Sequence, residues 1–448
     1  MTGWLPSAGV EWSDDPAVLD SRRADRSGWP PTGRPDAVAF PRTAAQVSRI
    51  LRLAHDARTP IVPRGAGTGL SGAATAGTGT VVLDLSRMNR IVAISPDDAT
   101  AVAEPGVITA DLDRAAAAQG LRYAPDPASV AISTIGGNIA TNAGGLRCAK
   151  YGVTRDSVLG LEVVLADGQQ ISTGTATLKG VAGYDLTGLF VGSEGTLGVV
   201  VRATVRLRPI PLATATIAAS FRDMEAAAEA AIALSAARVQ PAIAELLDEA
   251  TLLAIDAAQG TTLRSGGAAL LLVQTDGAGA ALEADLIAEV LAGTATSVRT
   301  TTDEAEAAEL LAARRLVLPS LERLGRPLIE DIAVPRSRLA DAVREITAIA
   351  ARHDVMIFTV AHAGDGNLHP LIVVDRAAAG IPVEAQQAAE EIFELALKLG
   401  GTISGEHGVG TLKRAWLRRE LGETNHTLQQ QIKSLFDPHN ILNPGKAI

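Results

Sequence analysis

Residues 63–73 read PRGAGTGLSGA. Glycine lets backbone N–H groups converge on an anion at close range, and Arg64 adds a charged donor, so the stretch predicts a diphosphate site. An apolar β-branched run precedes it at 60–62, and the run VVLDLS follows at 81–86. The segment between them, GLSGAATAGTGT, is too rich in Gly, Ser and Thr for a crossover helix. We therefore expect strand–loop–strand, not the strand–loop–helix of a Rossmann unit, although Asp84 has a suitable spacing for a ribose contact. A glycine run alone also fits a plain surface loop.

Two further segments share this small-residue character. Residues 125–152 read PDPASVAISTIGGNIATNAGGLRCAKYG, and residues 191–200 read VGSEGTLGVV. A plain loop as long as the first is unusual in a compact domain unless it is functional. Small side chains with amide and hydroxyl groups would let the backbone approach a large flat ligand. Together with the loop at 63–73, these segments favour a cofactor site.

Length and composition bound the class of protein. The chain has 448 residues, which predicts two or three domains. Its net charge of −10 without basic clusters argues against nucleic acid and anionic lipid as partners. A single cysteine, Cys148, excludes a disulfide framework and an iron–sulfur cluster held by this chain. The first residues predict no secretory signal, and no apolar run is long enough for a membrane span.

The texture of the sequence changes near residue 213. Alanine-rich helical segments alternate from there with apolar strands, which predicts an α+β domain with an antiparallel sheet. The expected helices are 223–237, 279–292, 336–351 and 384–399, and the expected strands are 268–274, 328–334 and 355–361.

Two histidines bracket a turn in HAGDGNLHP, residues 362–370. In an extended segment His362 and His369 would point to opposite faces, but the GDGN sequence favours a turn that brings both imidazoles together. Two histidines alone are better explained by one core histidine and one turn contact than by a metal site. SGEHGVG, residues 404–410, supplies Glu406, and two His with one Glu is a known set of zinc ligands. Imidazole also suits iron and manganese.

Six motifs now stand in a fixed order: PRGAGTGLSG, STIGGNIATNAGG, GSEGTLG, HAGDGNLH, SGEHGVG and FDPHNILNPGK. In this order they resemble the FAD-linked oxidases of vanillyl-alcohol oxidase and p-cresol methylhydroxylase type. Within that family the sequence is most similar to the branch of glycolate, D-lactate and D-2-hydroxyglutarate dehydrogenases, and in particular to glycolate oxidase flavin subunits. The resemblance covers residues 34 to 446.

The resemblance implies a fold and a domain order. An FAD-binding domain of p-cresol methylhydroxylase type, with two subdomains, is expected at 34–212 after a lead-in at 1–33. An α+β substrate domain with an antiparallel sheet, carrying the metal and catalytic motifs, is expected at 213–435. A tail at 436–448 is expected to return to the FAD domain.

The resemblance also implies the cofactor contacts. FAD is expected to bind without a covalent link, because the glycine-rich loop holds no histidine and has Thr68 inside it. Three groups of residues are assigned to FAD: the first to its pyrophosphate, the second to its adenosine and isoalloxazine, and the third to its adenine and ribose. Pro125 and Asn443 complete the predicted set. These groups are Arg64, Gly65, Ala66, Gly67, Thr68, Gly69 and Ser71; Thr134, Gly137, Asn138, Ala143, Gly144 and Gly145; and Glu194, Gly198 and Val199.

For the chemistry, the resemblance implies one divalent metal on His362, His369 and Glu406, with His407 as the base. Zinc is preferred to manganese and iron. A carboxylate substrate needs an arginine fork, and in AARRLVLPSL, residues 312–321, Arg314 has the family's spacing to Pro319. Arg315 is expected to face solvent.

Two apolar residues predict the size of the substrate. Ile329 and Leu371 stand where hydroxyglutarate enzymes have lysine and asparagine, and an unpaired distal carboxylate beside them would be costly. The expected substrate is a short D-2-hydroxy monocarboxylate such as glycolate or D-lactate. The alternative substrate is D-2-hydroxyglutarate. The alternative functions are a flavin subunit that serves electron transfer or assembly, and a metal-dependent hydrolase without flavin.

The electron acceptor must be external, because the chain has no iron–sulfur cysteines. A quinone, an electron-transfer flavoprotein, a cytochrome and an iron–sulfur partner all fit. The expected location is cytoplasmic, with attachment through a partner to the inner face of the membrane as an alternative. A homodimer is compatible with the resemblance.

Overall fold

The structure, a computed structural model, describes residues 2–378 and 380–448, and its contacts divide the chain into two compact units. The first unit contains the residues up to Gly145, Gly152–Ile210 and Glu406–Ile448, and the second contains Leu146–Tyr151 and Pro211–Gly405. The expected range of 213–435 for the second domain differs from this division at its end. Residues 406–435 belong to the first unit, because the backbone after His407 is hydrogen-bonded there. Leu146–Tyr151, expected in the first domain, belong to the second unit.

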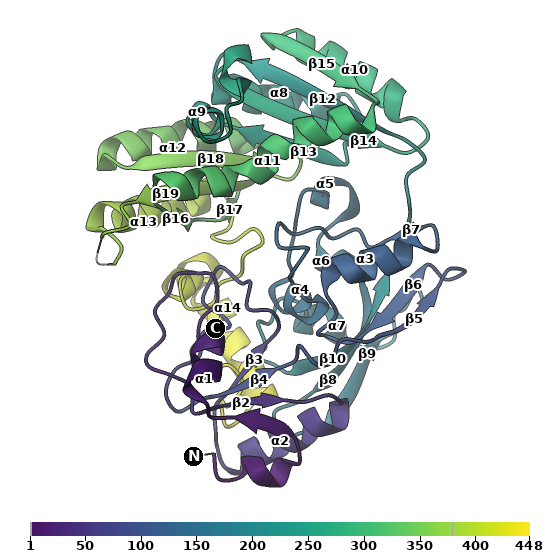
Figure 1. The fold of residues 1–448 in the computed structure, drawn as a ribbon, viewed down its shortest axis with the longest axis vertical. Coiled ribbons are helices and arrows are strands. Elements are labelled where there is room, and N and C mark those ends of the chain that lie inside the picture. The colour runs from purple at the N-terminus through teal and green to yellow at the C-terminus, as the bar shows by residue number, and fades with distance from the viewer. Residues whose placement is uncertain (1, 379) are drawn as a thin grey trace. The chain divides into compact units, whose positions relative to one another are not determined.

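Two main sheets, a smaller and a larger one, form the first unit together with one short two-stranded sheet (Figure 1). In the smaller sheet, strands β2, β4 and β3 run parallel in that order and β1 pairs with β2 antiparallel. The larger sheet is antiparallel throughout, in the order β5-β6-β10-β8-β9. The strands of the two sheets are β1 (Glu11–Ser13), β2 (Ala37–Phe40), β3 (Ile61–Arg64) and β4 (Val81–Asp84), and β5 (Ile91–Ser95), β6 (Thr100–Ala103), β8 (Val158–Val164), β9 (Gln170–Gly174) and β10 (Val199–Arg206).

Helices cover each sheet and give each subdomain a core. Ile50 and Leu51 of α2 (Ala44–Asp56) pack against the smaller sheet, and Leu112 of α3 (Thr109–Ala117) and Ile139 of α4 (Ile135–Thr141) pack against the larger one. The buried cluster around α2 also includes Val164, Val199 and Val201 of the larger sheet, and a further cluster with Val38 and Val62 packs on the smaller sheet. The remaining elements are η1 (Leu5–Ala8), α1 (Pro16–Arg22), β7 (Leu121–Arg122), α6 (Thr154–Ser157), α7 (Leu186–Phe190), β11 (Arg208–Pro209) and α14 (Arg414–Phe436).

The connection between β3 and β4 is a loop. Parallel neighbours usually need a helical crossover, yet residues 65–80 contain no helix. The expectation of strand–loop–strand is confirmed. The tail runs beside β3, where Ile61 N donates to Ile441 O and Asn443 N donates to Ile61 O.

One large antiparallel sheet forms the core of the second unit (Figure 1). Its order is β15-β12-β14-β13-β18-β19-β16, and β17 also pairs with β19. The α+β prediction with an antiparallel sheet is confirmed. The strands are β12 (Thr214–Phe221), β13 (Ile243–Leu247), β14 (Ala269–Asp276), β15 (Ser297–Thr301), β16 (Arg326–Ile329), β17 (Ile332–Ala333), β18 (Met356–His362) and β19 (Asn367–Val374).

The expected strand at 328–334 is two strands, β16 and β17, with Glu330 and Asp331 between them. Glu330 N donates to Pro370 O, so β19 stays paired while the Asp331 carboxylate turns to Ser404. The four expected helices are confirmed within a few residues. The helices of this unit are α5 (Cys148–Tyr151), α8 (Met224–Ala236), α9 (Glu249–Gln259), η2 (Leu263–Gly266), α10 (Ala280–Ala292), α11 (Glu304–Leu324), η3 (Arg336–Arg338), α12 (Leu339–His353) and α13 (Val383–Lys398).

Helices α9 and α11 cover one face of this sheet. Their apolar side chains meet alternate residues of β13, β18 and β19, as the period of a strand requires. Full burial of one such side chain contributes about 1.5–3 kcal/mol. The cluster includes Leu252, Ile255, Val317 and Leu321 from the helices and Leu247, Phe358, Val360 and Leu371 from the strands.

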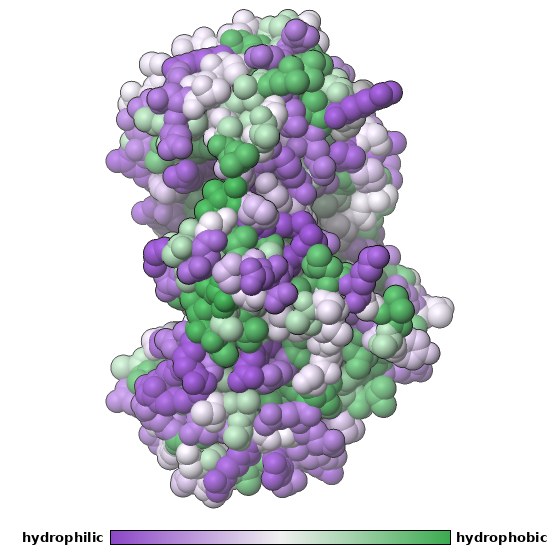
Figure 2. Space-filling model, turned by 90° about the vertical axis from the view of Figure 1, so that its right-hand side faces the viewer, coloured by the Kyte–Doolittle hydropathy of each residue, from purple (hydrophilic) through white to green (hydrophobic). Residues whose placement is uncertain are grey.

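Hydrophobic and hydrophilic residues are interspersed on the face seen in Figure 2. In the part of the chain that the structure describes, no helix is both long enough and apolar enough to span a bilayer.

Candidate active site: a glycine-rich loop and a histidine hairpin

The glycine-rich loop of the first unit exposes a row of donors. Among the described residues, no backbone N–H from Ala66 to Ala73 donates an intramolecular hydrogen bond. The side-chain oxygens Ser71 Oγ and Asn443 Oδ1 are buried beside this loop, and they too have no partner within the described chain. Buried polar groups are nearly always paired, so this arrangement fits a polar ligand that supplies the acceptors.

Carbonyl groups at the end of the same loop accept hydrogen bonds from Arg64, Asn443 and Lys446. Arg64 is buried and donates to Ala24 O at 2.9 Å, and burial lowers the pKa of its guanidinium. Asn443 Nδ2 and Lys446 Nζ each donate to Ala73 O at 3.0 Å. Ala73 O is thus paired, whereas the N–H groups from Ala66 to Ala73 have no acceptor among the described residues. Lys446 was missed in the sequence analysis, although it lies within the tail motif.

The second small-residue tract contains a helix. Thr134 caps α4 by accepting from Gly137 N, and its hydroxyl lies against Gly65 of the glycine-rich loop. Asn138 is buried and donates to Thr109 Oγ1 at 2.7 Å, so its amide stabilises the unit's interior. Ala143 O accepts from Thr154. The other predicted residues of this tract, Pro125, Gly144 and Gly145, lie in the non-helical segments on either side.

Glu194 connects the third tract to the SGEHGVG motif. Its buried carboxylate accepts from Val409 N at 2.6 Å and from Gly410 N at 2.8 Å. Burial raises the pKa of this carboxyl group to about 7, although the two N–H groups oppose the rise. Val199 begins β10 in the core of the unit and Gly198 directly precedes it, where a Cβ at Gly198 would lie 2.5 Å from Val163 Cγ1.

His407 therefore stands at the start of a segment that the first unit holds tightly. Ser71 O accepts from Thr411 N at 2.9 Å and from Leu412 N at 3.1 Å. Gly410 has a φ of 51°, and a Cβ there would collide with Ser71. His407 Nε2 lies 3.9 Å from Glu406 Oε1, and both side chains are half-buried. The structure thus joins the SGEHGVG motif to the glycine-rich loop and to Glu194.

In the second unit, the HAGDGNLHP motif is a hairpin. β18 ends at His362 and β19 begins at Asn367, with His362 opposite Asn367 and Val360 opposite His369. His362 and His369 are thus diagonal neighbours on one face. Their ring centroids are 5.1 Å apart in an edge-to-face arrangement, and ring nitrogens of the two lie within 4.8 Å. The turn brings the two imidazoles together, as predicted.

A carboxylate that the sequence analysis missed lies beside His362. Glu245 of β13 is fully buried and faces His362 across the strand pair. Its Oε1 is 2.6 Å from His362 Nδ1, and its Oε2 is 2.7 Å from Arg314 Nε. A carboxylate only accepts, so Nδ1 carries the proton and Nε2 keeps its lone pair. Glu245 is the one charged residue in IAELL, and that was the available signal.

Arg314 reaches this point from α11. Its side chain is 17% exposed, and its terminal Nη1 and Nη2 make no hydrogen bond to the described residues. Arg315, the next residue, is exposed as expected. A largely buried guanidinium with its fork free fits a carboxylate ligand.

A second carboxylate lies near His369. Asp331 Oδ1 is 3.9 Å from His369 Nδ1, and Asp331 Oδ2 accepts from Ser404 Oγ at 2.9 Å. Both histidines thus have a carboxylate on the Nδ1 side, a pattern typical of metal-binding histidines. Gly405, the last residue of this unit, lies so close to Asn367 that a Cβ there would collide with its amide.

Two apolar residues, Ile329 and Leu371, lie on the strands next to the hairpin histidines. Ile329 and Leu371 are directly opposite each other in the β16–β19 pair, and Leu371 is buried. Two residues along β19 from Leu371 stands His369.

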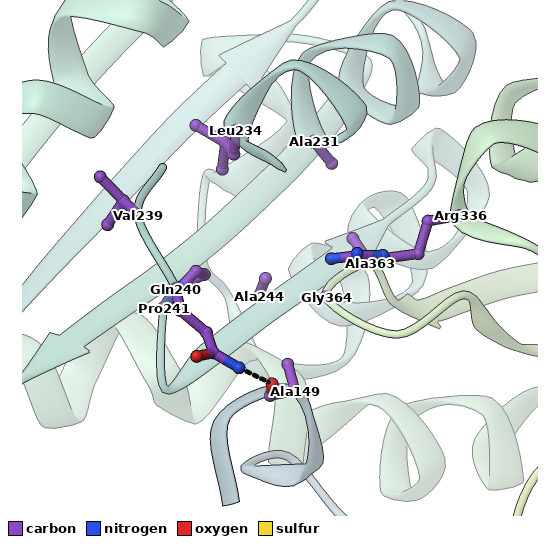
Figure 3. Close-up of a pocket in the computed structure, with 10 residues that line it drawn as sticks. All are labelled: Ala149, Ala231, Leu234, Val239, Gln240, Pro241, Ala244, Arg336, Ala363 and Gly364. Carbon is purple, nitrogen blue, oxygen red and sulfur yellow. Dashed lines mark hydrogen bonds between the residues drawn. The ribbon is translucent and has the colours of Figure 1, made fainter. Parts of the chain in front are cut away.

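A small pocket lies on the other side of the hairpin turn (Figure 3). Ala244, Ala363 and Gly364 line it together with Arg336, while Gln240 donates to Ala149 O at one edge. Arg336 is the only charged group there, so the pocket lacks acid–base residues.

The burial of Glu194 predicts a pH-dependent effect of Glu194→Gln. The carboxyl ionises near 4.5 in the unfolded chain and near 7 in the folded protein, so the folded state binds the extra proton between these values. Stability contributed by the protonated form is present at low pH and is lost as the pH rises through 7. Glutamine does not titrate. From pH 5 to 8 the stability of the wild type relative to the variant should fall by up to about 3 kcal/mol, at 1.36 kcal/mol per pKa unit. Denaturant unfolding at several pH values measures this, and a constant difference would contradict it.

Comparisons with known proteins identify the family of the chain. The FAD binding domain family matches residues 35–174, and the family "FAD linked oxidases, C-terminal domain" matches residues 210–447. The glycolate oxidase subunit GlcD of Bacillus subtilis (strain 168) is 48% identical over 417 residues, covering 92% of this chain and 88% of GlcD. The D-lactate dehydrogenase of Archaeoglobus fulgidus is 37% identical over 449 residues, covering 99% and 96%.

Solved structures give the fold. p-Cresol methylhydroxylase with substrate bound superposes with a TM-score of 0.79 at 20% identity, covering 97% of this chain and 93% of that one. A 4-ethylphenol oxidase from Gulosibacter chungangensis superposes with a TM-score of 0.76 at 21% identity, covering 97% and 94%. The predicted fold of p-cresol methylhydroxylase type is confirmed. With an FAD-binding domain followed by the C-terminal domain typical of these enzymes, the chain belongs to the FAD-linked oxidases.

Proposed function

We propose that this protein oxidises a short D-2-hydroxy monocarboxylate, of glycolate or D-lactate type, to the 2-oxo acid. The hydride goes to FAD, and the electrons pass to an external acceptor. The observation that carries the proposal is the pairing of Arg314 and His362 on the carboxylate of Glu245. This pairing places the terminal nitrogens of Arg314 near His362. In the proposal, Arg314 binds the carboxylate of a 2-hydroxy acid and His362 binds the metal that contacts its hydroxyl group. The names of two similar proteins, a glycolate oxidase subunit and a D-lactate dehydrogenase, refer to substrates of this type and support the proposal.

For FAD, the row of unpaired N–H groups from Ala66 to Ala73 supports binding of the pyrophosphate. Ser71 Oγ and Asn443 Oδ1 would add a donor and an acceptor. Thr134 and the start of α4 adjoin the loop, which supports the contacts expected for the second tract. Without histidine or cysteine in PRGAGTGLSGA, the cofactor is held non-covalently.

For the metal, His362 and His369 offer imidazole nitrogens close to one another, and a carboxylate, Glu245 or Asp331, lies near each ring. Glu245 accepts from His362 Nδ1, so Nε2 is the proposed coordinating atom of His362, while Asp331 lies 3.9 Å from His369 Nδ1. Glu406 follows Gly405, which is packed against Asn367 of the same hairpin, and consecutive Cα atoms are about 3.8 Å apart. Glu406 is the proposed third ligand, because two His with one Glu is a known set of zinc ligands. Zinc is the proposed ion, with manganese and iron as alternatives.

The chemistry divides between the bound groups and the side chains. Bound zinc would lower the pKa of the substrate hydroxyl, and bound FAD would accept the C2 hydride. Arg314 holds the substrate carboxylate through Nη1 and Nη2. His407 takes the hydroxyl proton on its imidazole, whose ordinary pKa of about 6.5 suits this role near neutral pH. Loss of that proton and of the C2 hydride turns the hydroxyl group into the 2-oxo group.

The apolar pair Ile329 and Leu371 supports a small substrate. A distal carboxylate beside these side chains would lose its hydration without gaining a partner. D-2-Hydroxyglutarate is therefore the less favoured substrate. An electron-transfer or assembly subunit remains the second candidate, because the acceptor is external.

Substrate preference is the first test. Under anaerobic conditions, glycolate or D-lactate should bleach the flavin absorbance, and kcat/KM should exceed that for D-2-hydroxyglutarate at least about tenfold, since 1.4 kcal/mol of desolvation is already tenfold. Removal of the metal with a chelator should abolish bleaching, and added zinc should restore it. A higher kcat/KM for D-2-hydroxyglutarate would show that the substrate assignment is wrong.

Arg314→Lys tests the carboxylate fork. Lysine keeps the charge beside Glu245 but loses one of the two terminal donors. A hydrogen bond to a charged group contributes about 1.5–3 kcal/mol, so KM for glycolate should rise at least about tenfold. Arg315→Lys, one residue away on the exposed side, is the matched control and should leave KM unchanged. Equal KM values for the two variants would remove Arg314 from the substrate site.

His407→Ala separates an enzyme from an electron-transfer subunit. Loss of a general base typically costs about 10²–10⁴ in rate, so flavin reduction should slow by that factor. The FAD content should not change, because Ser71 and Glu194 contact the backbone after His407. His426→Ala, in α14 of the same unit, serves as control. Reduction at the wild-type rate would favour the subunit role.

A further inference from the structure

The carboxylate of Glu245 has no assigned role, yet it touches two of the proposed functional side chains. It lies on β13, whose five residues are all buried, and it is itself fully buried. One oxygen meets His362 of β18 and the other meets Arg314 of α11. Three elements of the second unit therefore converge on this one group.

Stability alone does not explain a carboxylate at this position. Removing a charge from water is costly, and a buried ion pair can often be replaced by apolar residues without loss of stability. Apart from His362 and Arg314, its neighbours include the apolar Leu247 and Leu272 of the core cluster. A leucine at 245 would extend this core, so the charge indicates a function.

The two contacts of Glu245 have complementary effects. Accepting the Nδ1 proton of His362 fixes the tautomer and the ring orientation, and Nε2 then points away from Glu245. Accepting from Nε of Arg314 leaves both terminal nitrogens for a ligand. Because one rigid carboxylate makes both contacts, it also fixes the separation between the histidine and the guanidinium.

We propose that Glu245 is a positioning residue that couples metal binding at His362 to carboxylate binding at Arg314, and so matches the site to a 2-hydroxy acid. This inference rests on the proposed function. In a 2-hydroxy acid the hydroxyl-bearing carbon is bonded directly to the carboxylate carbon. A fixed separation between the two protein groups selects that spacing against a 3-hydroxy acid.

Asp331 does not duplicate this role. It lies 3.9 Å from His369 Nδ1, beyond hydrogen-bonding distance, and it accepts from Ser404 Oγ. Among these contacts of the two carboxylates, only that of Glu245 both orients a proposed ligand and reaches the substrate arginine.

The test uses the purified flavoprotein and Glu245→Gln. The amide must turn a donor toward either His362 or Arg314, so one contact is lost. After chelator treatment, a competitive zinc titration should give an affinity about 10- to 100-fold weaker than that of the wild type. KM for glycolate should rise about tenfold or more, and the FAD content should stay the same.

Asp248→Asn is the matched control. Asp248 is a buried carboxylate three residues further along, where it accepts from Thr251 N and Thr359 N and touches neither His362 nor Arg314. This variant should keep the zinc affinity and KM of the wild type. Glu245→Asp keeps the buried charge but is too short to span both partners, and it should show part of the same loss, including where Glu245→Gln does not fold.

The outcomes separate the two proposals. If the wild type neither binds zinc nor oxidises 2-hydroxy acids, the proposed function fails. If the wild type does both, and the Glu245 variants match it or merely match Asp248→Asn, the coupling role of Glu245 is overturned. A selective loss of zinc affinity and a raised KM in the Glu245 variants support it.

Discussion

The register of the β18–β19 hairpin determines where the polar side chains of the second unit lie. His362 stands opposite Asn367, so His369, two residues further on, projects from the same face. A shift of one residue would send His369 to the other face of the sheet. The same face receives Glu245 from β13, because Glu245 is paired with His362. The contact of Glu245 with His362 and the meeting of His362 and His369 thus follow from two strand registers, and these strands pack in the apolar cluster under α9 and α11.

The first unit depends on a different constraint, the separation of the two sides of a loop. The carbonyl groups of the glycine-rich segment are bound by Asn443 and Lys446 of the tail and by Arg64 below it. Its N–H groups are left without partners among the described residues. This arrangement is costly in an empty protein and favourable with a diphosphate present. The tail, far away in sequence, supplies donors to a carbonyl group of this loop, because Asn443 and Lys446 both donate to Ala73 O.

Local sequence was enough to predict those parts whose structure depends on local chemistry. Glycine density at 63–79 excluded a crossover helix, and GDGN between two strands predicted the turn that unites His362 and His369. Glu245 was missed, because a single Glu in an apolar strand has no periodic signature; its meaning comes from His362 and Arg314, which are 117 and 69 residues away. The same reason explains the end of the second unit. The hydrogen bonds of Glu194 to Val409 and Gly410 span more than 200 residues, and they draw residues 406–435 into the first unit. The helix α4 in the second tract was obscured by its glycines, whose low helix propensity is outweighed by the Thr134 cap and by packing of Ile135 and Ile139.

These contacts divide the chemistry between the units in a definite way. His407 precedes a segment whose N–H groups are bound by Ser71 and Glu194, so the proposed base is held by the unit that binds the flavin. His362, His369 and Arg314 are held by the other unit, through Glu245 and the hairpin. Gly405 is where the chain passes from one to the other. In the proposed reaction the base is thus anchored in the unit that contains the FAD-binding domain, while Arg314 and the two histidines are anchored in the other unit. Glu406, the proposed third metal ligand, belongs to the same unit as His407, so the proposed metal ligands come from both sides of the junction at Gly405.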